Sequence, residues 1–167
     1  YAFLGWFTQE TGGTQVDGNT VFKEAASTTY YAHWEEATVF SVVVPAVLPV
    51  TVDQNGKVYV SNAEIVNHST AAVQVSSVTL TAENGWTLVP YASDMSHAKV
   101  DSNQIGFKIN SAQTSKTGST EQFELTSPWQ INKEESLTLT YDAVVSALSQ
   151  PVTNANILSV LFVVEWA

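Results

Sequence analysis

The 167-residue sequence contains no cysteine, no arginine, six lysines and three histidines. Without cysteine, a disulfide framework and thiolate metal sites are excluded. Arginine is the side chain best suited to phosphates and base edges, so its absence and a net charge of −10 argue against nucleic-acid binding. The lack of basic clusters likewise argues against binding to anionic lipid surfaces. The excess of carboxylates indicates a charged, solubilising surface.

Long apolar runs and targeting segments are also missing. The runs at 39–52 and 157–166 are short and rich in β-branched residues, so we expect no membrane insertion. The sequence contains no signal peptide, and a secreted protein would therefore carry its targeting segment outside it. No helix-period segment of useful length occurs.

What the sequence does contain is a succession of strand patterns. Hydrophobic residues make up 44% of the chain and charged residues only 13%. From Thr38 onward there are roughly nine or ten strand-like segments with turn signals about every eight to twelve residues, as in β-sandwiches. We therefore predict an all-β, antiparallel β-sandwich of Greek-key or jelly-roll type over residues 37–167.

Local patterns make several features of this sandwich predictable. Asp53–Gly56 predicts a hairpin turn, because Asn-Gly favours the backbone of tight hairpins. The apolar positions of 72–82 change parity, which predicts a bulge at Ser76–Ser77. Residues 90–103 are polar and predict a loop with one helical turn. Ile157–Val164 is apolar on both faces, which predicts a central strand.

The stretch before the sandwich is rich in aromatic residues and glycines. Ala2–Thr8 predicts a strand, Gly12–Gly13 a turn and Thr28–Trp34 a second strand. Strict alternation assigns the side chains of the first strand to two faces, one with Phe3, Gly5 and Phe7 and the other with Leu4 and Trp6. A module this small must bury large aromatics to be stable, so we expect Trp6 and Trp34 to lie in its core.

This stretch resembles the Listeria–Bacteroides repeat, a small β-grasp-like module found in tandem on bacterial surface proteins, including the internalin B repeats. The matching residues are Phe3, Gly5, Trp6, Phe7, Thr8, Gly12, Gly13, Thr14, Tyr31, Ala32 and Trp34. The resemblance implies an incomplete β-grasp-like repeat over residues 1–36, because the first strand of the family pattern, V-T-F-D-x-N-G-G, is absent.

A missing strand would leave an edge able to accept another strand. The predicted acceptor edge comprises Ala2, Phe3, Leu4, Gly5, Trp6, Phe7 and Thr8. Three explanations remain open: the repeat was trimmed within an array, a neighbouring subunit donates the strand, or the stretch has merged with the sheet of the following domain.

The second part is similar to β-sandwich domains of secreted and cell-surface proteins of Gram-positive gut bacteria. The similarity lies in a V-P-x-x-L-P-V-T-V opening, a G-K-V hairpin, an A-x-I-x-N-x-S-T strand, an N-G-W-x-L strand and a final Glu-Trp. The acidic segment Glu35–Ala37 marks the boundary, which gives domains at 1–36 and 37–167. Both resemblances imply an extracellular location, either secreted or on the bacterial cell surface.

Residues capable of chemistry are scattered. The histidines, His33, His68 and His97, form no metal-binding spacing, and no catalytic motif occurs, so we predict no enzyme, no cofactor and no metal centre. Two options remain open. One is a surface calcium ion at Asp94, Asp101 and Asn103, and the other is an intramolecular isopeptide bond from Lys57, or from Lys108 near Asn110.

The aromatic residues beside turns suggest a binding role. Trp86, Tyr91 and Trp129 are candidates for stacking on sugar rings, with capping of the sandwich as the alternative. The sequence thus predicts a non-catalytic extracellular bacterial surface module acting as stalk, adhesin or assembly unit. A carbohydrate-binding module and a donor-strand filament subunit are the alternatives. The partners would be other surface proteins, host or glycan ligands, or identical subunits.

Overall fold

A computed structural model describes residues 1–21, 27–52 and 58–167. The chain is all-β, as predicted, and forms two compact units: unit 1, Tyr1–Val39, and unit 2, Phe40–Ala167. The predicted boundary after Glu36 lies a few residues before the observed one. Among the described residues, no helix has the length and apolar character needed to cross a membrane.

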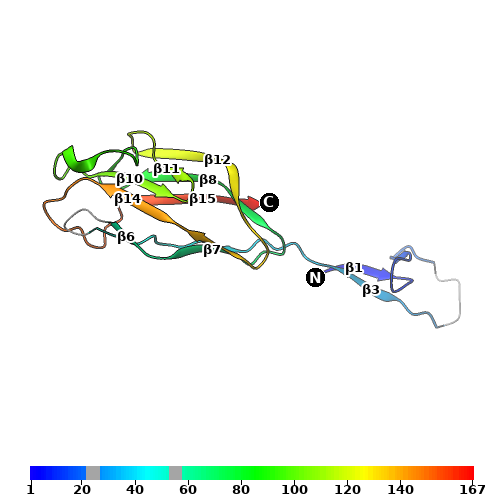
Figure 1. Ribbon diagram of the computed structural model, residues 1–167. Coiled ribbons are helices and arrows are strands. Elements are labelled where there is room, and N and C mark those ends of the chain that lie inside the picture. The colour runs from blue at the N-terminus through cyan, green and yellow to red at the C-terminus, as the bar shows by residue number, and fades with distance from the viewer. Residues whose placement is uncertain (22–26, 53–57) are drawn as a thin grey trace. The chain divides into compact units, whose positions relative to one another are not determined.

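Unit 1 is a small antiparallel sheet. Its strands are β1 (Ala2–Phe7), β2 (Gln15–Val16) and β3 (Tyr31–Glu35), in the order β2-β1-β3 (Figure 1). The Gly12–Gly13 turn lies between β1 and β2, and both glycines adopt positive φ angles, of 71° and 80°. Glycine reaches these angles without the steric penalty of a side chain.

The predicted faces of β1 are wrong because the strand contains a bulge. Phe3 lies opposite Trp34 and Gly5 opposite His33, so one extra residue of β1 falls between two consecutive residues of β3. A bulge of this kind shifts the side-chain alternation by one residue. Phe3 therefore shares a face with Trp6, where strict alternation placed it with Phe7.

Unit 2 is a β-sandwich. Its strands are β4 (Val42–Val43), β5 (Val50–Val52), β6 (Val58–Val60), β7 (Ala63–Asn67), β8 (Val73–Ala82), β9 (Thr87–Leu88), β10 (Gln104–Ile109), β11 (Ala112–Gln113), β12 (Thr120–Ile131), β13 (Ser136–Leu139), β14 (Tyr141–Val145) and β15 (Leu158–Trp166). A 3-10 turn, η1 (Met95–His97), lies in the loop that was predicted to contain one helical turn.

One layer of the sandwich is the sheet β12-β8-β15 (Figure 1). The rest of unit 2 comprises β11-β10-β14 with β9, β13-β7-β4, and the β5-β6 hairpin. Since only Thr140 separates β13 from β14, the predicted period-two strand 136–147 serves two sheets, pairing with β7 and then with β10. β5 and β6 pair as predicted, whereas the Asp53–Gly56 turn between them lies outside the described residues.

The core is assembled from strands of these sheets. The buried apolar residues are Ile65, Val73, Val75, Val78, Leu80, Leu88, Ile105, Phe107, Ile109, Ala112, Ile131, Leu139, Tyr141 and Ala143. β8 provides several of them because both of its edges are paired. The predicted bulge at Ser76–Ser77 is confirmed: Ser77 and Val75 are opposite Val163 and Val164, so Ser76 has no partner in the register.

The prediction that Ile157–Val164 forms a central strand is wrong. β15 pairs with β8 alone among the described strands and is therefore an edge strand. One of its faces packs on the core, while Leu161 and Val163 on the other face are 63% and 43% exposed. The sequence pattern of Ile157–Val164 predicted that both faces of the strand are buried. In the structure, one of these apolar faces is exposed.

Candidate functional site

The most prominent aromatic surface lies on the sheet of unit 1. Phe3 and Trp6 come from β1 and Trp34 from β3, and we call these three residues the aromatic face. The Phe3 ring centroid lies 4.9 Å from that of Trp34, in a tilted contact, and 5.9 Å from that of Trp6, in an edge-on contact. Such geometries are favourable for aromatic pairs. The bulge in β1 makes the cluster possible, because it brings Phe3 onto the face of Trp6.

The aromatic face is exposed, contrary to the prediction of a core position for its tryptophans. Phe3, Trp6 and Trp34 are 49%, 52% and 58% exposed. Among residues 1–21 and 27–39, none is buried. Exposed aromatic clusters of this kind mark surfaces that bind a partner or a ligand. This surface is a candidate site that the sequence pattern missed, since alternation alone separated Phe3 from Trp6.

The opposite face of the same sheet carries a second ring contact. The Phe7 ring and the His33 imidazole stack with centroids 4.0 Å apart and planes within 8° of parallel. The Nε2 atom of His33 lies 2.9 Å from the carbonyl oxygen of Gln9, which orients the imidazole. His33 is therefore tied to the loop after β1.

The predicted acceptor edge of β1 is largely paired within unit 1. β2 pairs with Trp6 and Phe7, and the Thr8 N–H donates to the Thr14 carbonyl over 3.1 Å. Further along, the Gln15 side-chain amide donates to the Leu4 carbonyl over 2.9 Å and so takes the place of a strand. In the remaining part of the predicted edge, Ala2 and Phe3 pair with β3 on one side, and among the described strands none pairs with them on the other side.

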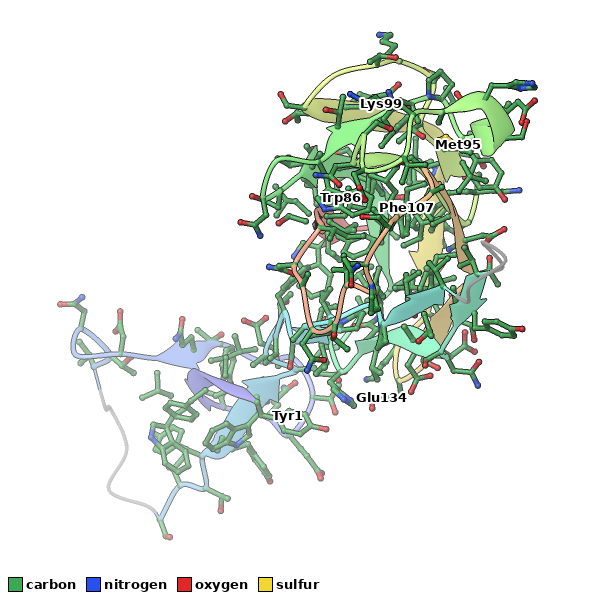
Figure 2. The ribbon with its side chains drawn as sticks, turned by 90° about the vertical axis from the view of Figure 1, so that its left-hand side faces the viewer. Tyr1, Trp86, Met95, Lys99, Phe107 and Glu134 are labelled. Carbon is green, nitrogen blue, oxygen red and sulfur yellow. The ribbon has the colours of Figure 1, made fainter. Side chains whose placement is uncertain are left out.

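The predicted sugar-stacking residues do not converge. Trp86 and Trp129 are half-buried and pack against the core of unit 2. Figure 2 labels Trp86 and the core residue Phe107. Trp129 is opposite Val75 in β8, whereas Trp86 follows the turn after the other end of β8, roughly 20 Å away along the strand. The indole N–H of Trp129 donates to the Ser111 hydroxyl over 3.0 Å. The two indoles therefore do not form one platform.

Tyr91, the third of these residues, is engaged with a carboxylate. Its hydroxyl donates to Asp142 over 2.7 Å. This hydrogen bond, together with partial burial and the negative charge of Asp142, raises the pKa of the Tyr91 hydroxyl above its usual range. The bond joins the segment after β9 to β14.

The carboxylate oxygens of Asp94 and Asp101, in the predicted calcium loop, accept hydrogen bonds from other residues of the protein. Asp101 accepts from the Ser149 backbone N–H over 2.8 Å and from its hydroxyl over 2.7 Å, and these bonds lower the pKa of Asp101. Asp94 caps η1 by accepting from the Ser96 N–H, and hydrogen bonding to Ser96 lowers the pKa of Asp94. Among the described residues, no three His, Asp or Glu side chains are grouped closely enough to hold a metal ion.

The lysines give no support to an isopeptide bond within the described residues. Lys108, Lys99, Lys116 and Lys133 are all exposed, whereas such a bond requires a lysine in the core. Lys57 lies outside the described residues. Glu121 is a buried carboxylate, but it is satisfied by the Ser115 hydroxyl and N–H and by the Lys116 N–H.

Comparison of the chain with protein-family models, with curated proteins and with solved structures gave no match.

Proposed function

We propose that this chain is a non-catalytic module of an extracellular bacterial surface protein, and that it works by contact, as an adhesin, stalk or assembly unit. The observation that carries the proposal is the aromatic face of Phe3, Trp6 and Trp34. A folded sheet whose large aromatics remain half-exposed loses the free energy that their burial would provide, roughly 1.5–3 kcal/mol for a large apolar side chain. A bound partner that covers these rings would recover that energy.

The resemblance of residues 1–34 to the Listeria–Bacteroides repeat supports the bacterial surface location. The all-β architecture and the acidic, arginine-free composition are also in keeping with a stable, soluble surface module. A protein-binding role suits the aromatic face because Trp and Phe are enriched in the binding hot spots of interfaces.

Location is tested by labelling cells of the organism that encodes the chain with an antibody against unit 2. We expect labelling of intact cells, or recovery of the protein from the culture medium. Labelling that appears only after permeabilisation would overturn the surface assignment.

Carbohydrate binding is the second candidate function. Its proposed site is the aromatic face, in place of Trp86, Tyr91 and Trp129. Exposed indoles stack on sugar rings through their faces, and Trp6 and Trp34 are the most exposed tryptophans of the chain. Titration with starch, xylan, mucin glycans and peptidoglycan, followed by tryptophan fluorescence, tests this candidate.

The matched variants for that titration are Trp6→Ser with Trp34→Ser, which removes the aromatic face, and Trp129→Phe, which keeps unit 1 intact. A fluorescence response that is lost in the first variant and kept in the second supports glycan binding at the aromatic face. A wild type that responds to none of the polysaccharides removes this candidate and leaves protein partners.

A further inference from the structure

The two edges of the sheet β12-β8-β15 differ in their protection. β12 carries Glu124 and Pro128, and its pairing with β8 is interrupted between Glu124 and Trp129. Charge, proline and irregularity are the usual means by which proteins block further strand pairing. β15 spans nine residues without lysine, proline or glycine, and Glu165 is its only charged residue. One edge of this sheet is thus protected against further pairing, whereas the other, β15, pairs with no second strand among the described residues.

The backbone groups on the open edge can be assigned from the hydrogen bonds to β8. At one end the Ile157 carbonyl accepts from the Glu83 N–H, and at the other the Ala167 N–H donates to the Ala72 carbonyl. Residues of an antiparallel strand alternate between facing the partner and facing away. Every second residue therefore directs its N–H and C=O away from β8, namely Leu158, Val160, Phe162, Val164 and Trp166.

We propose that β15 pairs antiparallel with β15 of a second copy of the chain, with Phe162 on the two-fold axis. This register joins Phe162 to its own copy, Val160 to Val164 and Leu158 to Trp166, and all of these residues carry outward-facing backbone groups. The interface is isologous and closes as a dimer. It would continue the sheet from one copy into the other.

The side chains favour the same register. Leu161 and Val163 project from the exposed face, and they would lie directly opposite each other across the axis, so that both copies cover their exposed apolar surface. Glu165 would face Ser159 of the other copy. A parallel in-register pairing would instead place the two Glu165 carboxylates side by side, which is unfavourable.

The size of the contact sets the expected affinity. A stable interface typically uses about 20–30 residues on each side, whereas β15 provides far fewer. The ring of Phe40 lies against that of Trp166, with the two centroids 5.1 Å apart, and it therefore lies beside one end of β15. The centre of the proposed contact is Val160–Val164. The high negative charge of each copy opposes association. We expect dimers to form at roughly 10–100 μM and to tighten as salt screens the repulsion.

Sedimentation equilibrium of the full chain at about 1–500 μM tests the association. Leu161→Glu places a second carboxylate at the centre of the contact and should weaken the dimer at least about tenfold. Val100→Glu is the matched control, because it changes the net charge equally at an exposed turn outside β15. A wild type that stays monomeric throughout, or two variants that weaken the dimer equally, would overturn the proposal.

Cysteine cross-linking tests the register, and the absence of native cysteine makes it specific. In the proposed dimer, residue 161 of one copy faces residue 163 of the other, a spacing suited to a disulfide, whereas identical positions lie on a longer diagonal. A mixture of Leu161→Cys and Val163→Cys proteins should therefore cross-link much more than either protein alone. Equal cross-linking in all three samples would exclude this register.

The dimer is distinct from the proposed contact surface of unit 1. The Trp6→Ser and Trp34→Ser variant should lose partner binding by the aromatic face and keep the wild-type dimer constant. Failure of either proposal is thus visible without reference to the other.

Discussion

At the scale of single residues, Asn67 is the polar centre of unit 2. It lies at the end of β7 and is fully buried. Its side-chain amide donates to the carbonyls of Ala71, Ile131 and Asn132 over 2.9–3.0 Å, and its Oδ1 accepts from the Ser69 N–H over 2.8 Å. One side chain thus joins the turn after β7 to the end of β12. A buried amide of this kind is stabilising because its own polar atoms are satisfied and because it pairs with backbone groups in a buried setting, those of Ile131 and Ser69 among them.

Asn67→Ala should destabilise unit 2 by about 2–4 kcal/mol, because it removes four hydrogen bonds and leaves the buried Ile131 carbonyl and Ser69 N–H without this partner. Urea denaturation followed by circular dichroism measures the change. Asn62→Ala is the control, since Asn62 is exposed, and it should stay within about 0.5 kcal/mol of wild type. Similar stabilities for the two variants would contradict the role assigned to Asn67.

Tyr91 gives a prediction for alkaline pH. Because its pKa is raised by the hydrogen bond to Asp142, the folded state holds the phenolic proton more tightly than the unfolded state. The stabilisation is therefore complete below the ordinary tyrosine pKa of about 10, and it is lost as the pH rises through the folded-state pKa.

Tyr91→Phe should consequently lower the melting temperature at pH 7 and reduce the decline in stability above pH 10. Thermal unfolding of wild type and variant between pH 7 and pH 11 measures this difference. Parallel pH profiles of the two proteins would show that the Tyr91–Asp142 bond does not contribute.

At the scale of elements, the bulge in β1 determines which side chains share a face. Gly5 lies within it at a φ of 129°, a conformation that residues with a Cβ rarely adopt. A Cβ at this position would also lie 2.5 Å from the Nε2 atom of Gln15, the group that pairs with the Leu4 carbonyl. The backbone conformation of the bulge and the hydrogen bond from Gln15 to the edge of β1 therefore both depend on Gly5.

Gly5→Val should disrupt the sheet of unit 1 while the core of unit 2 stays folded. Two-dimensional amide NMR separates the two, and we expect the dispersed signals of β1 and β3 to collapse. Gly18→Val is the control, because a Cβ at Gly18 meets no neighbouring atom and the residue has no positive φ. Retention of the unit 1 signals in Gly5→Val would show that the bulge tolerates a side chain.

The sequence predicts a bulge or a strand pair when that feature depends on residues that are neighbours along the chain. The bulge at Ser76–Ser77 was visible as a change of parity, and the β5-β6 pair as two strands flanking an Asn-Gly turn. The bulge in β1 was not visible, because Ala2–Phe7 contains no polar residue whose position could reveal a change of parity, and the irregularity arises from pairing with β3. The edge position of β15 was hidden for the same reason, since an apolar run does not report which strands lie beside it.

At the scale of the whole molecule, the two units differ in how they are stabilised. Unit 2 contains the buried core of the chain, with residues such as Phe107 and Leu80 excluded from solvent. Unit 1 has no buried residue among those described, and its aromatic rings contact each other while remaining partly in water. We infer that unit 2 folds by its own core, and that unit 1 gains stability when its aromatic face is covered.

Residues 40–167 produced alone should therefore fold, with a melting temperature within about 2 °C of the transition of unit 2 in the full chain. Scanning calorimetry of both proteins tests this expectation. A fall of more than about 5 °C would show that unit 1 contributes to the stability of unit 2.

The sequence by itself determined the all-β class and most strand positions, because these follow from side-chain period, turn residues and composition. Only the tertiary structure decided that Phe3, Trp6 and Trp34 form one exposed aromatic face, that Trp86 and Trp129 lie apart, and that β15 is an open edge. These features depend on which strands pair, in which register, and on which surfaces remain uncovered. Pairing of this kind joins residues far apart in the chain, and a local pattern does not specify which distant strands lie side by side.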